Sequence, residues 1–282
     1  MNCFQLIKTV LDEAYDSIPG KKAAKDVAIE QELDGLSKAY KKLLKKGCLD
    51  YSDPARRFAY LYRYTTSHAN IVYGKISEFK ALRELFKQDR LFMSCIGGGP
   101  GSDFLGILKY CMRHKKKIEL KCQIMDRDPA WSESWSDVDD KVKSTFRIST
   151  SYQPIDVADP ASWTKFNKHF QADLFTLIYF MSEVFAVADK AEAYFSTLLS
   201  QMKPGATLLY VDNNDSRFSD WFDWLAKKAK LTVLKCGAGV EKMPWDEEKS
   251  DLEPYFSKFG APKLDADIAY RVVQKPARRR RR

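Results

Sequence analysis

The sequence predicts an α/β protein in which a doubly wound parallel sheet follows an N-terminal group of helices. A glycine-rich turn, residues 97–101, separates a short apolar run from an amphipathic segment. After this turn, short apolar runs alternate with helical patterns, as in sheets whose parallel strands are joined by helices. Before it, residues 1–88 have helical periodicity and no strand pattern. We therefore expect a helical cap over residues 1–88, a sheet domain over 89–275 and a basic tail over 276–282.

Helical patterns make up the whole of the predicted cap. Apolar side chains recur with helical spacing over residues 4–15 and again over 33–44. Asp53 followed by Pro54 is typical of a helix start, because the carboxylate accepts from free backbone N–H groups and proline fits the first turn. An aromatic-rich helix follows, and the last pattern covers residues 76–86.

The apolar runs of the second part are expected to be strands. Residues 174–180 are almost uninterrupted in their apolar character, which is typical of a central strand covered on both faces. The predicted strands cover residues 91–96, 118–125, 147–151, 174–180, 206–211, 231–235 and 268–274. The predicted helices that follow the first of them cover residues 103–112, 137–147, 160–170, 188–202 and 218–230. The proline-containing stretch 237–267 is expected to be largely irregular.

The 282-residue chain has an ordinary globular composition, with 45% hydrophobic residues. It contains no apolar run of about 18 residues, so we expect no membrane-spanning helix. Residues 1–10 lack the apolar core of a signal peptide. The six cysteines are scattered and form no Cys-X-X-Cys pair. We therefore expect a reduced, intracellular protein with neither a zinc site nor a disulfide framework.

The formal net charge is +9, and five of the positive charges lie in the terminal run Arg278 to Arg282. A polybasic end can bind the phosphate groups of RNA, or it can serve as a nuclear or nucleolar address. It can equally be a solvated tail with neither function. The charge therefore indicates RNA as one partner to consider and leaves the function of the tail open.

The glycine-rich turn is the first candidate binding element. Gly97, Gly99 and Gly101 permit a tight turn and the close approach of a ligand. The backbone N–H groups at the start of the next helix suit an anionic or polar ligand group. A dinucleotide-binding fingerprint needs its third glycine where Ser102 stands, so the pattern fits a nicotinamide enzyme less well.

Several spaced features after this turn resemble a class I S-adenosylmethionine-dependent methyltransferase. Residues 95–101 look like the first motif of that family, and residues 202–205, Met-Lys-Pro-Gly, look like its turn before the fifth strand. Asp126, which closes the second predicted strand, looks like the acid that holds the ribose hydroxyls. Asp156 and Val157 look like the pair on the adenine side.

The resemblance covers about residues 88–275. It implies a seven-stranded Rossmann-like methyltransferase sheet that ends in an antiparallel hairpin, and S-adenosyl-L-methionine as cofactor. One position departs from the family, which often has an acid where Cys95 stands. Asp103 either replaces that acid at the methionine end of the cofactor or only complements the helix dipole. The missing acid also keeps open a regulator that binds the cofactor without catalysis.

A narrower resemblance concerns the methyl acceptor. The aromatic helix over residues 58–73, the strand end Cys-Ile-Gly-Gly-Gly and residues 126–131 together resemble the fungal large-subunit ribosomal RNA uridine-N3 methyltransferases. This resemblance implies an RNA substrate, bound through the cap and the basic tail. A small molecule or a protein as acceptor stays an alternative, and the oligomeric state stays open.

Polar residues after the fourth and fifth predicted strands are weak catalytic candidates. Ser182 and Glu183 could contact or deprotonate a substrate, and their alternative interpretation is a helix cap with an acid in the first turn. Asp212 is a third such candidate, and Asn213 beside it is a candidate substrate contact. Both also suit a simple turn. This cluster fits no known metal-binding loop, so we expect no metal.

Two residues of the predicted cap are further substrate candidates. His68 could face the cofactor cleft from the cap, although a hydrogen-bonded structural histidine is the competing interpretation. Tyr62 belongs to an aromatic series that could bind the substrate or could simply fill the core.

Overall fold

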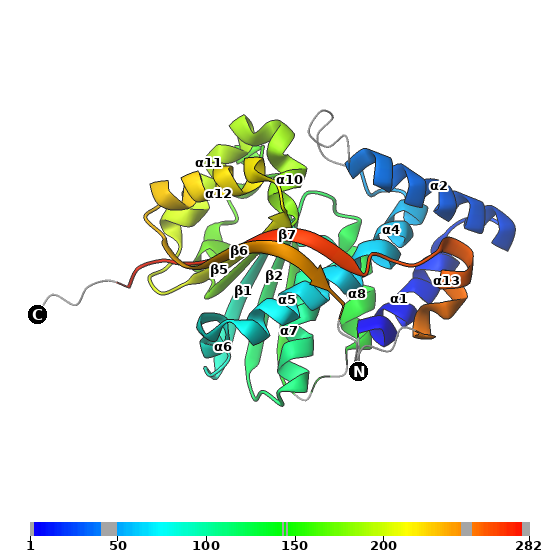
Figure 1. The fold of residues 1–282 in the computed structure, drawn as a ribbon, viewed down its shortest axis with the longest axis horizontal. Helices are drawn as coiled ribbons and strands as arrows, with labels where there is room; N and C mark the ends of the chain where they lie inside the picture. Colours follow the sequence, from blue (N-terminus) through cyan, green and yellow to red (C-terminus); the bar gives the residue numbers. More distant parts are fainter. Residues whose placement is uncertain (1–2, 41–49, 143, 145, 244–249, 278–282) are drawn as a thin grey trace, which may run out of the picture.

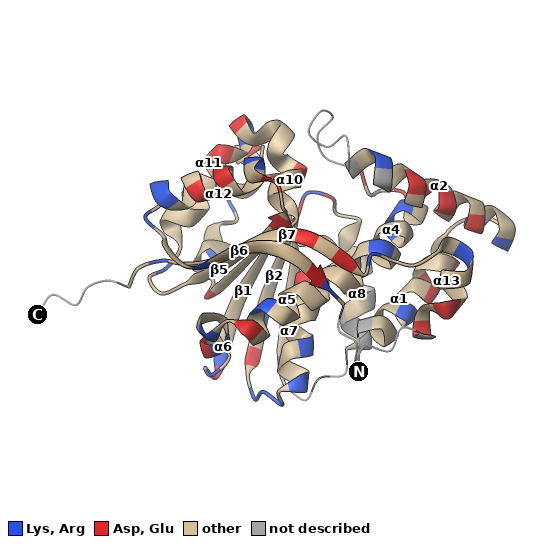
Figure 2. Cartoon of the chain, viewed as in Figure 1, with Lys and Arg blue, Asp and Glu red and all other residues tan. Residues whose placement is uncertain are grey.

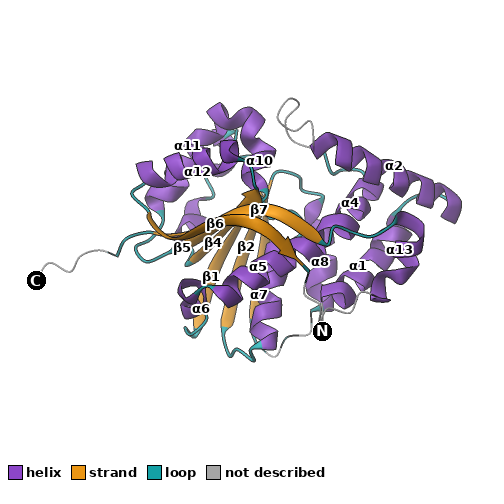
Figure 3. Ribbon diagram, viewed as in Figure 1, coloured by secondary structure: helices purple, strands orange, loops and turns teal. Residues whose placement is uncertain are grey.

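In a computed structural model of the protein, the structure describes residues 3–40, 50–142, 144, 146–243 and 250–277 (Figure 1). Its centre is one seven-stranded sheet with the strand order β3-β2-β1-β4-β5-β7-β6 (Figure 3). The strands are β1 Arg90–Ile96, β2 Glu119–Asp126, β3 Ile148–Pro154, β4 Leu174–Ile178, β5 Thr207–Asn213, β6 Thr232–Lys242 and β7 Asp265–Gln274. The α/β fold class predicted from the sequence is confirmed.

The strand directions confirm a doubly wound sheet. Strands β1 to β5 are parallel, and the chain leaves β1 first toward β2 and β3, then returns to β4 and β5. Strand β7 is antiparallel to both β5 and β6, which gives the expected terminal hairpin. The carboxyl ends of β1 and β4 are neighbours, with Ile96 opposite Leu177. In such sheets ligands bind outside the carboxyl ends of the strands, where the strand order reverses. We call this side of the sheet the carboxyl edge.

Alternating side chains of the strands bury two separate apolar cores, one on each face. On β5, Leu209 and Val211 belong to the first core, and Leu208 and Tyr210 belong to the second. The first face is covered by α5 Thr66–Glu78, α6 Lys80–Leu85, α7 Ser102–Arg113 and α8 Trp131–Lys141 (Figure 1). The second carries α9 Pro160–Trp163, η2 Asn167–Gln171, α10 Phe180–Val184, η3 Phe185–Val187, α11 Ala188–Gln201 and α12 Ser216–Lys228.

The remaining helices continue the first core. They are α1 Cys3–Ser17, α2 Lys22–Tyr40, α4 Pro54–Tyr60, the π-helical turn η1 Leu61–Thr65, η4 Ser250–Leu252 and α13 Glu253–Phe259. Asp53 caps α4 as expected, since its Oδ1 accepts from the N–H groups of Ala55 and Arg56. Gly106 lets α5 pack closely on α7, because an added Cβ would lie 2.2 Å from the carbonyl oxygen of Ala69. The division at residue 88 into cap and sheet domain stays a prediction.

Three sequence-based expectations about elements were wrong. The helix expected over residues 137–147 is α8 and begins already at Trp131, because the buried rings of Trp131 and Trp135 anchor its first turns. The helix expected over 160–170 is split into α9 and η2. The stretch 237–267 is not largely irregular, because β6 extends to Lys242 along its partner β7 and Pro254 lies in the first turn of α13.

Within the described residues, no helix combines the length and apolar character that crossing a membrane requires.

Candidate functional site

The glycine-rich turn joins β1 to α7 and is tied to the end of β2. Gly97, Gly99 and Gly101 have φ angles of 65°, 47° and 79°, in the left-handed region that favours glycine. The N–H group of Gly101 donates to the carbonyl oxygen of Gly98 over 2.7 Å. The N–H group of Gly99 donates to Oδ2 of Asp126 over 3.0 Å. The turn and the acid predicted to bind the ribose are therefore one hydrogen-bonded unit.

The three glycines have different surroundings. A Cβ atom added to Gly97 would lie 2.0 Å from the ring of Phe180, and one added to Gly101 would lie 2.1 Å from the ring of Trp135. At Gly99 the nearest atoms would be 3.9 Å away, on Asp126 and Trp131. Gly97 and Gly101 therefore make room for aromatic rings of the protein itself, whereas a Cβ at Gly99 would make only ordinary van der Waals contacts.

Asp126, Asp156 and Val157 line one pocket at the carboxyl edge, together with Tyr51 and Glu183. Asp126 is the last residue of β2, and Asp156 and Val157 lie just beyond the end of β3. Because β2 and β3 pair in parallel, with Asp126 opposite Pro154, these residues meet although about thirty positions separate them along the chain. The structure thus brings together the residues that the sequence predicted on the adenosine side.

The carboxylates of Asp126 and Asp156, two of the four acidic residues that line this pocket, are held by backbone groups. Oδ1 of Asp126 accepts from the N–H group of Asp128 over 3.1 Å, and its Oδ2 accepts from Gly99. Burial raises the pKa of Asp126 to about 6, and these hydrogen bonds oppose that rise. Oδ1 of Asp156 accepts from the N–H group of Ala158 over 2.9 Å. Both side chains are therefore oriented before any ligand binds.

Asp103 lies in the first turn of α7 and is only 1% exposed. Its carboxylate accepts hydrogen bonds from the hydroxyl of Thr176, the N–H group of Phe104 and the thiol of Cys95. Burial raises its pKa. The carboxylate thus lies directly beside Cys95, the position at which the motif resemblance expects an acid.

Aromatic side chains of the N-terminal helices lie across the carboxyl edge. Tyr60, Tyr64 and His68 recur every fourth residue through α4, η1 and α5, and we call them the aromatic ladder. Ring centroids are 5.3 Å apart between Tyr60 and Tyr64 and 5.8 Å apart between Tyr64 and His68. The ladder reaches Trp131 beyond β2, 5.1 Å from Tyr60, and Tyr179 beyond β4, 4.4 Å from His68. Its middle is the π-helical turn η1, a feature frequent at functional sites.

The two substrate candidates of the cap differ in position. His68 is buried in the ladder, where burial and the nearby charge of Lys263 lower its pKa to about 3. It is therefore a neutral stacking group at physiological pH. Tyr62 faces the other way, donates to the carbonyl oxygen of Gly260 and packs against Phe58 and Phe259. This arrangement agrees with the core interpretation of Tyr62 and separates it from the pocket.

The three catalytic candidates also separate. Oδ2 of Asp212 accepts from the N–H group of Ser182 over 3.0 Å, and its Oδ1 accepts from the N–H group of Asn213 over 2.8 Å. Burial raises the pKa of Asp212 to about 6. This buried carboxylate of β5 therefore accepts from the first turn of α10. Ser182 lies inside α10, whose N-cap is Tyr179, so it does not cap the helix, whereas Glu183 is the acid expected in the first turn. Of the three candidates, Glu183 is the one that lines the pocket beside Asp126.

Sequence reasoning missed Tyr51, Tyr60 and Phe180. Tyr60 is 8% exposed; its burial raises its pKa, and so do the nearby carboxylates of Glu183, Asp126 and Asp103. The i, i+4 spacing of the ladder was a usable signal for this residue. Tyr51 gave no local signal, because only the fold brings it to the pocket, where its N–H group donates to Asp128 over 2.7 Å.

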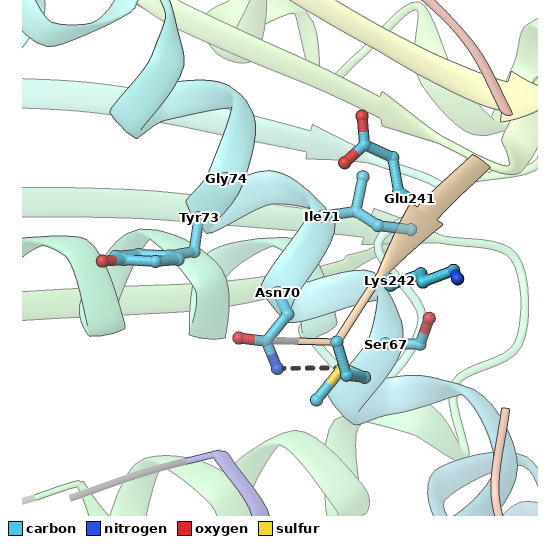
Figure 4. A pocket seen from close by; sticks show the side chains of 8 residues that line it. Ser67, Asn70, Ile71, Tyr73, Gly74, Glu241 and Lys242 are labelled. Atoms are coloured by element: carbon cyan, nitrogen blue, oxygen red, sulfur yellow. Dashed lines mark hydrogen bonds between the residues drawn. The ribbon is translucent and has the colours of Figure 1, made fainter. Parts of the chain in front are cut away.

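A second pocket lies between α5 and the end of β6 and is lined by Ser67, Asn70, Glu241 and Met243, among others (Figure 4). Nδ2 of Asn70 points at Sδ of Met243, 3.3 Å away. Glu241 pairs with Lys75, and Oδ1 of Asn70 accepts from Lys109. None of the sequence-predicted site residues lines this pocket. In the described part of the chain, no group of three or more His, Cys, Asp or Glu residues could hold a metal ion.

No family model and no curated protein matches the sequence. Among solved structures, a candidate RNA methyltransferase from Pyrococcus horikoshii is similar, with a TM-score of 0.46 and 12% identity over 85% of this chain and 98% of that one. A methyltransferase from Pyrococcus furiosus has a TM-score of 0.42 and 12% identity over 71% and 82%. Precorrin-6y C5,15-methyltransferase from Geobacter metallireducens has a TM-score of 0.39 and 10% identity over 83% and 92%. At these identities and TM-scores, the similarity assigns neither a family nor a substrate to this chain.

Proposed function

We propose that this chain binds S-adenosyl-L-methionine at the carboxyl edge and transfers its methyl group. The observation that carries the proposal is the meeting of Asp126, Asp156 and Val157 in one pocket, with Gly99 of the glycine-rich turn hydrogen-bonded to Asp126. These are the positions that the motif resemblance marks for the adenosine half of the cofactor. Their sequence spacing and their spatial convergence are independent observations that support the same ligand.

The residues of the pocket fit the adenosine half of this cofactor. A carboxylate oxygen accepts more than one hydrogen bond, so Asp126 can accept from a ribose diol while it keeps its two backbone donors. Asp156 can accept from the exocyclic amine of adenine, and Val157 offers an apolar contact to the base. Asp126 and Asp156 would thus fix the orientation of the nucleoside.

The surroundings of Tyr60 suit a cationic ligand group. Its hydroxyl lies near the carboxylates of Glu183, Asp126 and Asp103. Negative charge and aromatic faces together favour a cation such as a sulfonium. Asp103 is our candidate for the methionine end, because it lies beside Cys95. Gly97 and Gly101 would support this end through the shape of the turn and not through open space.

S-adenosylmethionine supplies an activated methyl group, so the chain itself needs to align the acceptor and exclude water. Tyr60 and His68 of the aromatic ladder are buried and Tyr64 is half-buried. The ladder lies over the carboxyl edge, where it would exclude water. Glu183, which lines the pocket, is our candidate for contact with the acceptor or for removal of its proton.

RNA is the acceptor that the sequence favours, and this finer proposal rests on the charge of +9 and on the resemblance stated above. Both signs of charge are distributed over the helices around the sheet in Figure 2. The run Arg278 to Arg282 lies outside the described residues. RNA would therefore depend on the tail for general affinity, and a nuclear or nucleolar location stays a prediction from the same run.

Isothermal titration with S-adenosylmethionine and S-adenosylhomocysteine tests the cofactor proposal. We expect binding by the full chain and a loss of about 1–3 kcal/mol of binding free energy in Asp126→Ala. Asp159→Ala is a matched control, because this exposed acid caps α9 without lining the pocket. Transfer of radiolabelled methyl groups to total RNA, protein and small-molecule fractions would then identify the acceptor class. Absence of binding to either compound by the folded chain would reject the proposal.

A further inference from the structure

The segment that joins α13 to β7 carries a lysine over the aromatic ladder. The N–H group of Lys263 donates to the carbonyl oxygen of Arg63 over 2.9 Å, which fixes this segment along η1. The ammonium of Lys263 lies 5.5 Å from the ring centroid of Tyr179 and 6.0 Å from that of Tyr64. A half-buried cation therefore lies at the carboxyl edge, beside the residue that follows β4. We call this part of the edge the acceptor side.

This ammonium has no acidic partner within the part of the chain that the structure describes. Three other buried or half-buried lysines each have an acidic partner or a polar acceptor: Lys75 pairs with Glu241, Lys109 donates to Asn70, and Lys258 pairs with Asp26. Arg63, whose positive charge acts on Lys263, hydrogen-bonds to the side chain of Tyr64 and makes no ion pair in the described residues. Two like charges are thus held together in a partly desolvated place, which is unfavourable without an anion.

The groups around Lys263 come from four elements and do not neutralise it. Burial lowers the pKa of Lys263, the charge of Arg63 on η1 lowers it further, and Asp265 on β7 opposes this without forming an ion pair. His68 on α5 is neutral at physiological pH. The hydroxyl of Tyr179, at the end of β4, is buried and has no hydrogen-bond partner among the described residues.

Lys263 is also close to the place where the proposed reaction would occur. Tyr179 precedes Phe180, whose ring covers Gly97 and which lines the pocket of Asp126. Glu183 lines the same pocket, and its charge acts on both Tyr60 and Tyr64 of the ladder. A molecule that reached Glu183 from the β4 side would pass Lys263.

We propose that Lys263, with Arg63 beside it, binds an anionic group of the methyl acceptor, either a phosphate or a carboxylate. The inference rests on the proposed function, since it concerns the second substrate of that reaction. An incoming anion would supply the missing partner of both cations through charge-assisted hydrogen bonds. Lys263 is then a specificity-determining residue that selects acidic acceptors over neutral ones.

Competitive labelling of lysines with an amine-reactive reagent, followed by mass spectrometry, tests this on the full chain. Labelling across a pH series with and without inorganic phosphate reports both the basicity and the protection of each lysine. We expect phosphate to slow the labelling of Lys263 by about threefold or more, since a bound anion shields the amine and favours its protonated form. Lys258 is the control within the same sample, because Asp26 already pairs with it.

A second series with malonate in place of phosphate distinguishes the two sources of the anion. Protection by phosphate alone indicates a phosphorylated acceptor, and protection by malonate alone indicates a carboxylate. Protection by neither overturns the inference. The variant Lys263→Arg should still bind the anion, and Lys263→Gln should not. The control variant Lys258→Gln should bind the anion as the unsubstituted chain does.

An internal partner is excluded by one further variant. Residues 246–248, Asp-Glu-Glu, lie outside the described residues, so Asp246→Asn, Glu247→Gln and Glu248→Gln are combined. Faster labelling of Lys263 in this variant without any added anion would show that the chain supplies its own partner, and the inference would be wrong. Titration with S-adenosylhomocysteine separates this failure from failure of the proposed function, because cofactor binding does not depend on Lys263.

Discussion

The two halves of the carboxyl edge are built from different kinds of sequence information. On the adenosine side, Asp126, Asp156 and Val157 stand at the ends of adjacent strands in one continuous part of the chain. On the acceptor side, His68 and Lys263 approach Tyr179 from distant parts of the chain. The order of the strands is enough to bring the residues of the first half together. The residues of the second half meet only because distant segments of the chain pack at the same edge.

The two halves also differ in charge. The pocket on the adenosine side is lined by four acidic residues, Asp126, Asp128, Asp156 and Glu183, and by Arg127. The acceptor side holds the ammonium of Lys263, with the positive charge of Arg63 and the opposing charge of Asp265 near it. Substitutions that act on only one of the two halves test this difference.

The largest effect is expected at the glycine-rich turn. Gly101→Ala should lower the free energy of unfolding by about 2–4 kcal/mol, because the left-handed conformation strains an alanine and its Cβ would clash with Trp135. Gly205→Ala is the matched control: its φ is 86° but nothing lies within 4 Å, so about 1–2 kcal/mol of strain remains. Urea denaturation of both variants measures the difference. Equal losses would mean that Trp135 does not fill the space at Gly101.

The next effect concerns the pH dependence of cofactor binding. Asp126 is ionised only above a pKa of about 6 in the unliganded protein, and its ionised form is the better acceptor for a diol. Affinity for S-adenosylhomocysteine should therefore be complete above this pKa and should fall about tenfold as the pH drops to about 5. Titration calorimetry at several pH values measures this fall. Asp126→Asn should bind more weakly at neutral pH and should lack this dependence.

The stability of the unliganded fold should change with pH in the opposite direction to cofactor affinity. Because burial raises the pKa of Asp126 in the folded state above the ordinary value of 3.8, the unfolded chain loses its proton first as the pH rises. The associated stability is thus complete below about 3.8 and is lost as the pH rises through about 6. Thermal unfolding without ligand should show less of this loss in Asp126→Asn, with the remainder arising from Asp212 and Asp103, whose pKa values burial also raises.

A smaller effect tests whether Asp103 compensates for Cys95. Asp103→Asn should weaken the binding of S-adenosylmethionine by about 1 kcal/mol, because a charged acceptor is lost, whereas Cys95→Ala should leave it unchanged. Titration calorimetry of the two variants, with circular dichroism to verify folding, gives the comparison. Weakening in Cys95→Ala alone would mean that the thiol, and not the carboxylate, supports the methionine end.

The smallest effect on either half should come from the tail. Deletion of Arg278 to Arg282 should leave cofactor affinity unchanged and should weaken RNA binding for unrelated sequences alike, because phosphate contacts carry little sequence information. The salt dependence should also become shallower, by about 0.7 log units per lost contact on single strands. Filter binding at two salt concentrations measures this. A full chain without RNA affinity would remove RNA as the acceptor and leave the adenosine side unaffected.

Part of this protein is determined by local sequence. Periodicity and turn residues predicted the parallel sheet and the cap of α4 at Asp53, and the motif resemblance implied the terminal hairpin. Asp126 and Asp156 were also named from the resemblance. Their position after a strand fixes their place at the carboxyl edge, and their role in binding stays a prediction. Such features depend on a few neighbouring residues and can therefore be predicted without knowledge of the whole fold.

The surroundings of the other candidate residues depend on packing between segments that are distant in the sequence. The sequence predicted that Gly97 and Gly101 allow the close approach of a ligand, but the rings of Phe180 and Trp135 occupy the space beside them. Asp212 was a catalytic candidate in the sequence, with a simple turn as the alternative, but it is buried in β5 and its carboxylate accepts from the N–H group of Ser182 in α10. The position of Lys263 beside Tyr179 depends on side chains more than eighty residues apart. Packing between distant segments determines which polar groups are satisfied internally, and no local pattern records that outcome.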